Sequence, residues 1–229
     1  MLSIIIPTWN ASQELAATLD YLGGSIVLPE MPPWEVVAAD GGSMDGTVDL
    51  AMSRGGRVVS APRGRGTQLM AGAAAAQGDW LLFLHADTRP GPGWAKAVAR
   101  FMADPENADG RAAYFRFALD DPGSKARRLE CAVAWRCRAL GLPYGDQGLL
   151  LSRALYRAVG GFRPLPLMED VDLVRRIGRR RLVALDVPAV TSAARWRQDG
   201  WGRRSARNLL CLSLYFLGVP PHLIAKLYA

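Results

Sequence analysis

Four acidic residues stand where a carboxylate could bind a cation or accept a proton. Asp40 and Asp87 each follow a short apolar run, and Glu169 and Asp170 form an adjacent pair much later in the chain. A hard divalent cation prefers oxygen ligands and usually combines one or two protein carboxylates with substrate phosphates. A further carboxylate in a loop or at a helix start is a common general base. These acids therefore indicate cation-assisted chemistry on a phosphorylated substrate.

Two glycine-rich loops accompany these acids. Gly41-Gly42 follows Asp40 directly, and the loop at 63–66 reads Arg-Gly-Arg-Gly. Glycines allow a backbone to approach a phosphate group closely. Arginine makes bidentate contacts with phosphate oxygens. Both loops therefore support the binding of a phosphorylated ligand.

The elements that would position these residues follow the pattern of an α/β protein. Strands are expected at 2–6, 34–39, 57–60 and 79–84, because apolar runs such as 2–6 and 80–84 are typical of strands buried in a sheet. Strand, loop and helix alternate three times, which indicates a parallel sheet with right-handed crossovers. The carboxyl ends of such strands share one edge of the sheet, where open α/β folds bind ligands. We therefore expect Asp40 and Asp87 to lie at the same edge.

Asp87 has a second interpretation. It could cap the helix expected near 94–101, because Asp is a common N-cap residue. The sequence Pro90-Gly-Pro-Gly93 is expected to prevent the strand from continuing beyond the acid. Helix capping and cation binding both stay open at this position.

The second half of the chain predicts a less regular arrangement. We interpret residues 1–195 as one domain and 196–229 as a helical appendage that is not an independent domain. The apolar part of segment 203–219 is too short to span a bilayer, which needs about 20 apolar residues. Contact with a membrane surface, packing on the domain and a dimer contact all stay open for it. The expected strands are 111–119, 149–151 and 182–187, and the expected helices are 125–140, 153–159, 169–179 and 205–217.

The composition sets outer limits. A chain of 229 residues fits one α/β domain, and its 50% hydrophobic content argues against disorder. The net charge of +7 comes mainly from arginine, which suits phosphate and carboxylate but also follows from compositional bias. Charge alone does not indicate a nucleic-acid partner, and we expect none. Three cysteines without metal-type spacing argue against a disulfide scaffold or a zinc site.

No signal peptide is recognisable, so we expect a cytoplasmic protein, and peripheral attachment to the inner membrane face stays open.

Four motifs in this order resemble those of the inverting family 2 glycosyltransferases with the GT-A fold. The resemblance covers about residues 1–180, and it implies a mostly parallel, Rossmann-like α/β sheet flanked by helices. A narrower set at 64–68, 85–88 and 145–148 resembles a small bacterial branch, some of whose members are associated with arsenosugar biosynthesis. The four motifs are SIIIPTWN at 3–10, ADGGSMDGT at 39–47, LFLHAD at 82–87 and MEDVDL at 168–173.

The resemblance places the nucleotide of a sugar donor near the first two motifs. Asp40 would accept a hydrogen bond from the nucleobase, and Arg65 would lie near the nucleotide or its diphosphate. The residues assigned to the nucleotide are Pro7, Thr8, Asn10, Asp40, Gly42, Ser43, Arg65 and His85.

The resemblance also assigns the metal and the base. Asp87 matches the second acid of the family's Asp-x-Asp motif, which binds a divalent metal such as Mn²⁺ or Mg²⁺. His85 stands at the first position of that motif. His can ligate transition metals more readily than magnesium, or it can hydrogen-bond a ribose, and we favour the ribose contact. Glu169 and Asp170 match the acidic pair and are assigned as catalytic, with Asp170 as the general base.

Other residues have less specific assignments. Asp146 and Gln147 lie between glycines and would contact the donor or acceptor sugar, or form a plain turn. Arg195, Trp196 and Arg197 resemble the place where some relatives complete the diphosphate site. Asp172 is interpreted as part of a solvated helix face.

Together these residues predict transfer of a sugar from a nucleoside diphosphate donor to an acceptor hydroxyl, with inversion. One alternative is a sugar-nucleotide nucleotidyltransferase. Such enzymes usually carry a glycine-rich, basic loop after the first strand, where this chain has Pro7-Thr-Trp-Asn10. Another alternative is a non-catalytic protein that binds a nucleotide, which the replacement of the first metal acid by His85 would fit.

Overall fold

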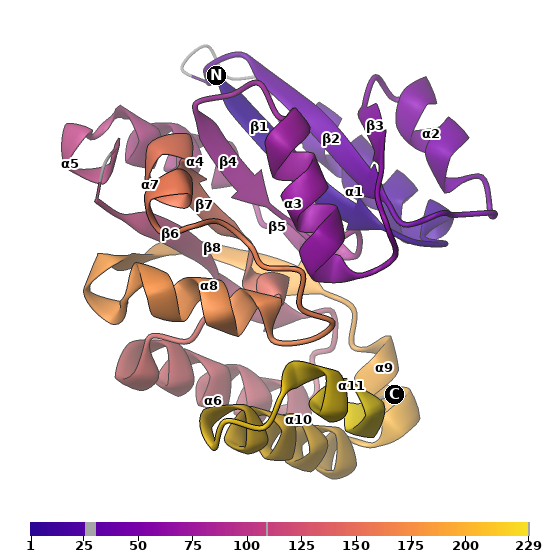
Figure 1. The fold of residues 1–229 in the computed structure, drawn as a ribbon, viewed down its shortest axis with the longest axis vertical. Coiled ribbons are helices and arrows are strands. Elements are labelled where there is room, and N and C mark those ends of the chain that lie inside the picture. Colours follow the sequence, from indigo (N-terminus) through magenta and orange to yellow (C-terminus); the bar gives the residue numbers. More distant parts are fainter. Residues whose placement is uncertain (26–30, 109, 229) are drawn as a thin grey trace.

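The computed structural model describes residues 1–25, 31–108 and 110–228. Their strands form one eight-stranded sheet (Figure 1), in the order β3-β2-β1-β4-β7-β6-β8-β5. β7 and β5 run antiparallel to their neighbours, while the other paired strands are parallel, so the expected mostly parallel α/β fold is confirmed. The strands are β1 (Leu2–Thr8), β2 (Trp34–Asp40), β3 (Arg57–Ser60), β4 (Trp80–Phe83), β5 (Thr88–Pro90), β6 (Ala112–Leu119), β7 (Leu149–Ser152) and β8 (Leu182–Thr191).

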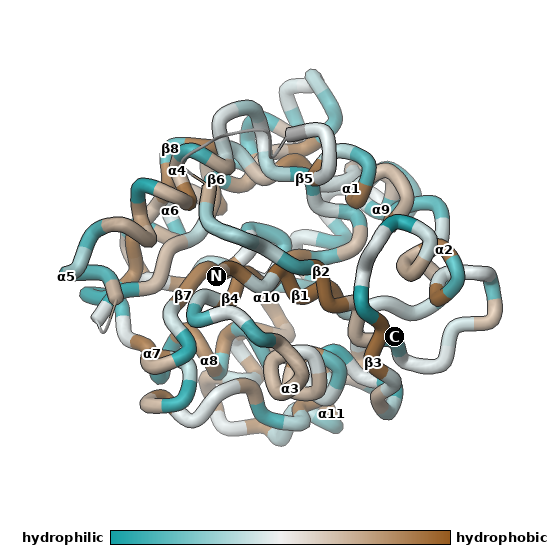
Figure 2. The backbone as a smooth tube through the Cα atoms, turned by 90° about the horizontal axis from the view of Figure 1, so that it is seen from above, coloured by the Kyte–Doolittle hydropathy of each residue, from teal (hydrophilic) through white to brown (hydrophobic). Residues whose placement is uncertain are grey.

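Helices cover both faces of this sheet. Ile4 and Ile6 of β1 lie in one core with α1 and α4, while Ile5, between them, lies in a second core with α3 and α8. Alternate side chains of a strand point to opposite faces, which explains why the run is apolar throughout. Figure 2 shows hydrophobic residues along β1 in the middle of the molecule. The helices are α1 (Ser12–Ser25), α2 (Thr47–Ser53), α3 (Arg65–Ala75), α4 (Trp94–Ala103), α5 (Pro105–Ala108), α6 (Ser124–Leu140), α7 (Arg153–Ala158), α8 (Glu169–Ile177), α9 (Ala194–Asp199), α10 (Trp201–Phe216) and α11 (Pro221–Tyr228).

Some element boundaries differ from the expected ones. β8 continues through Pro188, although proline cannot donate to a sheet, because the register shifts between Phe115 and Arg116 of β6. The chain after Asp87 also forms β5, which pairs with the end of β8. In addition, α1 runs through the glycine pair at 23–24, although glycine is a poor helix former.

The last three helices pack below the sheet (Figure 1). Leu212 of α10 joins the core that contains α3 and α8. Cys211 of α10 and Ile224 of α11 form a smaller cluster with Leu167. The division into 1–195 and 196–229 stays a prediction. No helix in the described part of the chain is both long and apolar enough to cross a membrane.

Candidate active site

The ends of β1 and β2 hold Asp40 in a fixed position. Its carboxylate accepts hydrogen bonds from the Thr8 hydroxyl at 2.9 Å, from the Gly42 and Ser43 amides at 2.9 and 2.8 Å, and from the Ser43 hydroxyl at 2.5 Å. Burial alone would raise the pKa of Asp40, but these bonds, led by those from Ser43, hold it below its ordinary value. The acid therefore stays charged, and it organises the loop that follows β2.

The loop after β1 is joined to the same turn. Asn10 has a φ of 46°, in the left-handed region. Its amide donates to the Ser43 hydroxyl at 2.9 Å, and its side-chain oxygen accepts from the Met44 amide at 2.9 Å. These bonds fix one wall of a first cavity, which Pro7, Thr8 and Asn10 line together with residues of α3 and of the segment that follows β4.

Helix α3 brings Arg65 to this cavity. The helix starts close to the backbone at 163–165, where a Cβ on Gly66 would collide with the carbonyl oxygen of Arg163. Glycine is therefore needed for this close approach. Arg65 then reaches the start of α8, where its Nε lies 3.1 Å from Glu169 Oε1.

The chain after β4 carries His85 and Asp87 to the same place. Asp87 does not cap α4, because the N-cap residue is Gly93 and no side chain caps that end, so the capping interpretation is wrong. Asp87 instead lines the first cavity and a second one beside it. Burial, together with Arg65, lowers the pKa of His85, which favours the neutral imidazole.

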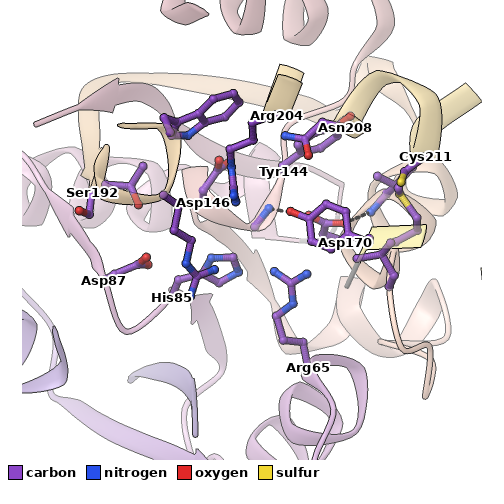
Figure 3. Close-up of a pocket in the computed structure, with 18 residues that line it drawn as sticks. Arg65, His85, Asp87, Tyr144, Asp146, Asp170, Ser192, Arg204, Asn208 and Cys211 are labelled. Carbon is purple, nitrogen blue, oxygen red and sulfur yellow. Dashed lines mark hydrogen bonds between the residues drawn. The ribbon is translucent and has the colours of Figure 1, made fainter. Parts of the chain in front are cut away.

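Asp170 lies in the second cavity, at the first turn of α8 (Figure 3). Met168 directly precedes the two acids Glu169 and Asp170 at the start of α8. Its φ is 66°, an uncommon value for a residue other than glycine. The Asp170 carboxylate accepts from the Gly145 amide at 2.8 Å and from the Val171 amide at 2.7 Å. Both oxygens are thus oriented by backbone donors of two different segments.

The loop at 145–148 packs tightly against the segment that follows β4 and against β6. A Cβ on Gly145 would lie 2.5 Å from His85 Nε2, so only glycine fits between the imidazole and Asp170. The next residue, Asp146, also lines the second cavity. Burial raises the pKa of Asp146 to about 6; Arg136 opposes the shift, and nearby acids such as Asp170 add to it.

The second cavity lies between the carboxyl edge of the sheet and the C-terminal helices. It encloses about 880 Å³, including the space at its open mouth. Its wall includes Trp196 of α9, Arg204, Asn208 and Cys211 of α10, and Tyr228 of α11. The side chains shared by both cavities are Arg65, His85, Asp87, Arg195 and Tyr228.

The structure corrects two expectations about neighbouring polar residues. Gln147 is 1% exposed, and its amide bonds the Phe115 carbonyl at 3.1 Å and the Tyr144 amide at 3.2 Å. It therefore points into the protein and cannot reach a sugar in either cavity. Asp172 is not on a solvated face, because it is 7% exposed and its carboxylate binds Arg163 and Arg176.

Other assigned residues lie beside the cavities rather than in their walls. Gly42 and Ser43 hold Asp40 but do not line the first cavity. Glu169 is 1% exposed, and its Oε2 has no hydrogen-bond partner among the described residues. Burial raises the pKa of Glu169, while Arg65 opposes that shift. Glu169 thus contacts Arg65 rather than the space where a sugar would bind.

Sequence reasoning did not find the wall formed by α10 and α11. Arg204, Asn208 and Cys211 recur at intervals of four and three residues, so they share one face of α10. That spacing was the available signal, but nothing local indicates which cavity this face meets.

The described residues contain no group of three or more His, Cys, Asp or Glu side chains that could hold a metal ion by themselves. Asp87 nevertheless faces the region shared by both cavities. A cation bound through one carboxylate and the phosphates of a ligand fits this arrangement. A metal site made entirely from protein side chains does not fit this arrangement.

The sheet, with its cleft at the carboxyl edge beside Asp40 and Asp87, defines a protein of the GT-A type. The chain belongs to glycosyl transferase family 2, whose family model matches residues 3–152. The resemblance to this family is therefore confirmed, while the likeness to the branch associated with arsenosugar biosynthesis stays a prediction.

Curated relatives and solved structures agree with this assignment. The chain is 39% identical over 94 residues to the "PGL/p-HBAD biosynthesis glycosyltransferase" of Mycobacterium bovis and Mycobacterium tuberculosis. This match covers 38% of the chain and only 35% of those relatives.

Two solved structures share the fold over a larger part of the chain. The mannosyltransferase PcManGT from Pyrobaculum calidifontis, in complex with GDP-Man and Mn²⁺, has a TM-score of 0.67 and 20% identity, covering 100% of this chain and 68% of that one. Glucosyl-3-phosphoglycerate synthase from Mycobacterium tuberculosis, in complex with Mn²⁺, UDP and glucosyl-3-phosphoglycerate, has a TM-score of 0.62 and 20% identity, covering 96% and 81%. At these identities the likeness shows the fold.

Proposed function

We propose that this protein transfers a sugar from a nucleoside diphosphate sugar to an acceptor hydroxyl, with inversion at the anomeric carbon. The observation that carries the proposal is the meeting of two cavities at Arg65, His85 and Asp87. The first is lined by Pro7, Thr8 and Asn10, which are among the residues assigned to the nucleotide, and the second contains Asp170. A donor across the junction would have its anomeric carbon near that carboxylate.

The first cavity would hold the nucleotide beside Pro7, Thr8 and Asn10. Asp40, with Gly42 and Ser43, would fix this wall, and a base contact would require one of its present hydroxyl donors to turn away. Arg65 would pair with the diphosphate while Glu169 holds its other side. We assign His85 to the ribose and Asp146 to a hydroxyl of the donor or acceptor sugar.

Asp87 would hold a divalent cation, Mn²⁺ or Mg²⁺, together with oxygens of the diphosphate. Such an ion, when bound, neutralises charge that develops on the departing nucleoside diphosphate. The presence of Mn²⁺ with a nucleotide in both solved relatives supports this assignment.

Asp170 would act as the general base. It would take the proton of the acceptor hydroxyl as that oxygen bonds the anomeric carbon and the bond from this carbon to the diphosphate breaks. The backbone donors of Gly145 and Val171 keep the carboxylate oriented for this transfer. Glu169 would position Arg65 instead of contacting the reacting atoms.

The test is to screen nucleoside diphosphate sugars by thermal shift with and without Mn²⁺, and then to follow diphosphate release and sugar transfer. A ligand at 100 times its dissociation constant adds about 2.7 kcal/mol of stability. We expect one donor to stabilise the protein and to lose its sugar in the presence of metal. Consumption of a nucleoside triphosphate with pyrophosphate release would support the nucleotidyltransferase instead. Binding without donor hydrolysis or transfer would support a non-catalytic protein.

We also propose that the protein acts in the cytoplasm, where nucleotide sugars would be available to it. No sequence or structural feature described above indicates a nucleic-acid partner.

A further inference from the structure

The outward side of α10 and α11 is unusually apolar. Most large apolar side chains of the protein are buried, but these two helices, together with the C-cap residue of α10, expose six of them. We call this surface the outer stripe. It consists of Leu209 (65% exposed), Leu210 (54%), Phe216 (48%), Leu217 (81%), Leu223 (44%) and Leu227 (58%).

The outer stripe is not the side by which these helices pack on the protein. On α10 its members recur at intervals of one, six and one residues, and they share a face, while Cys211 and Leu212 on the other side are buried. On α11, Ile224 is buried between the exposed Leu223 and Leu227. α10 and α11 also share a buried cluster and lie together at one end of the molecule (Figure 1). Exposed apolar patches on this scale mark interaction surfaces.

The charged side chains of α10 and α11 themselves have one sign. Between residues 200 and 228 the sequence contains no Asp or Glu. Arg203 and Lys226 are exposed, and the guanidinium of Arg175 lies 4.8 Å from the ring centroid of Phe216. Arg204 and Arg207, by contrast, form ion pairs within the protein. Their guanidinium nitrogens lie 2.6 and 2.9 Å from the Asp199 carboxylate.

Exposed apolar side chains next to positively charged groups are suited to an anionic partner. A second copy of the chain, placed stripe to stripe, would bring three cations against the same three cations. An anionic lipid surface would accept the apolar side chains in its interface and the arginine and lysine groups at its phosphates. We propose that the outer stripe docks this protein on the surface of a membrane that contains anionic lipid.

Docking would also bring the membrane close to the second cavity. The opposite face of α10 supplies Arg204, Asn208 and Cys211 to the wall of that cavity. One helix would thus contact lipid on one side and a substrate on the other. The docking itself does not depend on the proposed glycosyl transfer.

The experiment is flotation of the full chain with vesicles of phosphatidylcholine alone or mixed with phosphatidylglycerol. We expect the protein to float with the mixed vesicles, to bind them less at high salt, and to stay unbound with phosphatidylcholine. Leu209→Ser with Leu217→Ser should abolish flotation. Arg203→Ser with Lys226→Ser should weaken vesicle binding about tenfold or more.

Met52→Ser is the matched control, because Met52 is 54% exposed on α2, at the other end of the molecule (Figure 1). This variant should bind vesicles like the unchanged protein, and all variants should keep its melting temperature within a few degrees. Absence of binding to mixed vesicles would overturn the proposal. So would a dimer in sedimentation velocity that Leu209→Ser with Leu217→Ser converts to a monomer. Donor binding is measured separately, so its failure would leave the membrane result interpretable.

Discussion

Arg65 and Glu169 form an ion pair between the start of α3 and the start of α8, with Arg65 Nε 3.1 Å from Glu169 Oε1. The Arg65 side chain is 42% exposed and faces both cavities, whereas that of Glu169 is 2% exposed. The buried acid therefore fixes a cation that a ligand can reach. This relationship gives Glu169 a role that differs from that of Asp170 beside it.

We expect Glu169→Gln to weaken donor binding while changing kcat much less, because Arg65 would lose the partner that orients it. The dissociation constant for a nucleoside diphosphate should rise about tenfold, which corresponds to about 1.4 kcal/mol. Titration calorimetry and a comparison of KM with kcat measure this. The control is Glu106→Gln, an exposed acid paired with Arg111. A large fall in kcat with unchanged donor affinity would instead make Glu169 a catalytic residue.

Gly145→Ala should damage the site by steric contact. The added Cβ would lie 2.5 Å from His85 Nε2, so the loop or the imidazole must move, and the amide of residue 145 would lose its bond to Asp170. We expect activity to fall at least tenfold and stability by about 1–3 kcal/mol. Gly202→Ala is the control, because no atom lies within 4 Å of its added Cβ in α10. There the helix should gain about 0.5–1 kcal/mol. Equal behaviour of both variants in denaturant titrations and assays would contradict this account.

Asp146 should make stability depend on pH. Its pKa rises from 3.8 to about 6 on folding, so between these values the folded state binds more protons than the unfolded state. The contribution of Asp146 to the free energy of unfolding is therefore complete below pH 4 and is lost as the pH rises through 6. Asp146→Asn should flatten this decline and add about 1–3 kcal/mol at pH 7. Denaturant unfolding from pH 4 to 8 measures the slope, and an unchanged slope would show that the burial of this acid has no such effect.

The strands that carry Asp40 and Asp87 were predictable because they are buried on both faces. A run such as Ile4–Ile6 is apolar throughout, and its polar continuation marks the edge of the sheet. The positions of the two acids follow from strand direction alone. The motif at 168–173 likewise indicates Asp170, which lines the second cavity.

Features that depend on distant contacts were not predictable. Asp146 and Gln147 are neighbours in one loop, yet one faces the cavity and the other is buried, because the backbone turn at 145–147 decides their directions. Asp172 was expected in solvent, but Arg163 and Arg176 approach it from separate segments. The continuation of β8 through Pro188 needs a bulge in its partner strand, which no local pattern in 182–191 indicates.

Asp170→Asn tests the proposed chemistry most directly. The amide keeps the size of the carboxylate but cannot accept a proton from the acceptor, so kcat should fall by about 10²–10⁴. Binding of the donor nucleotide should change little, since Asp170 lines the second cavity and not the first. Initial rates of sugar transfer and nucleotide titration of the same preparation separate the two effects. Asp186→Asn is the matched control, because that acid is 98% exposed and pairs only with Arg116 among the described residues. Full turnover by Asp170→Asn would exclude Asp170 as the general base, because the amide cannot take the proton of the acceptor hydroxyl.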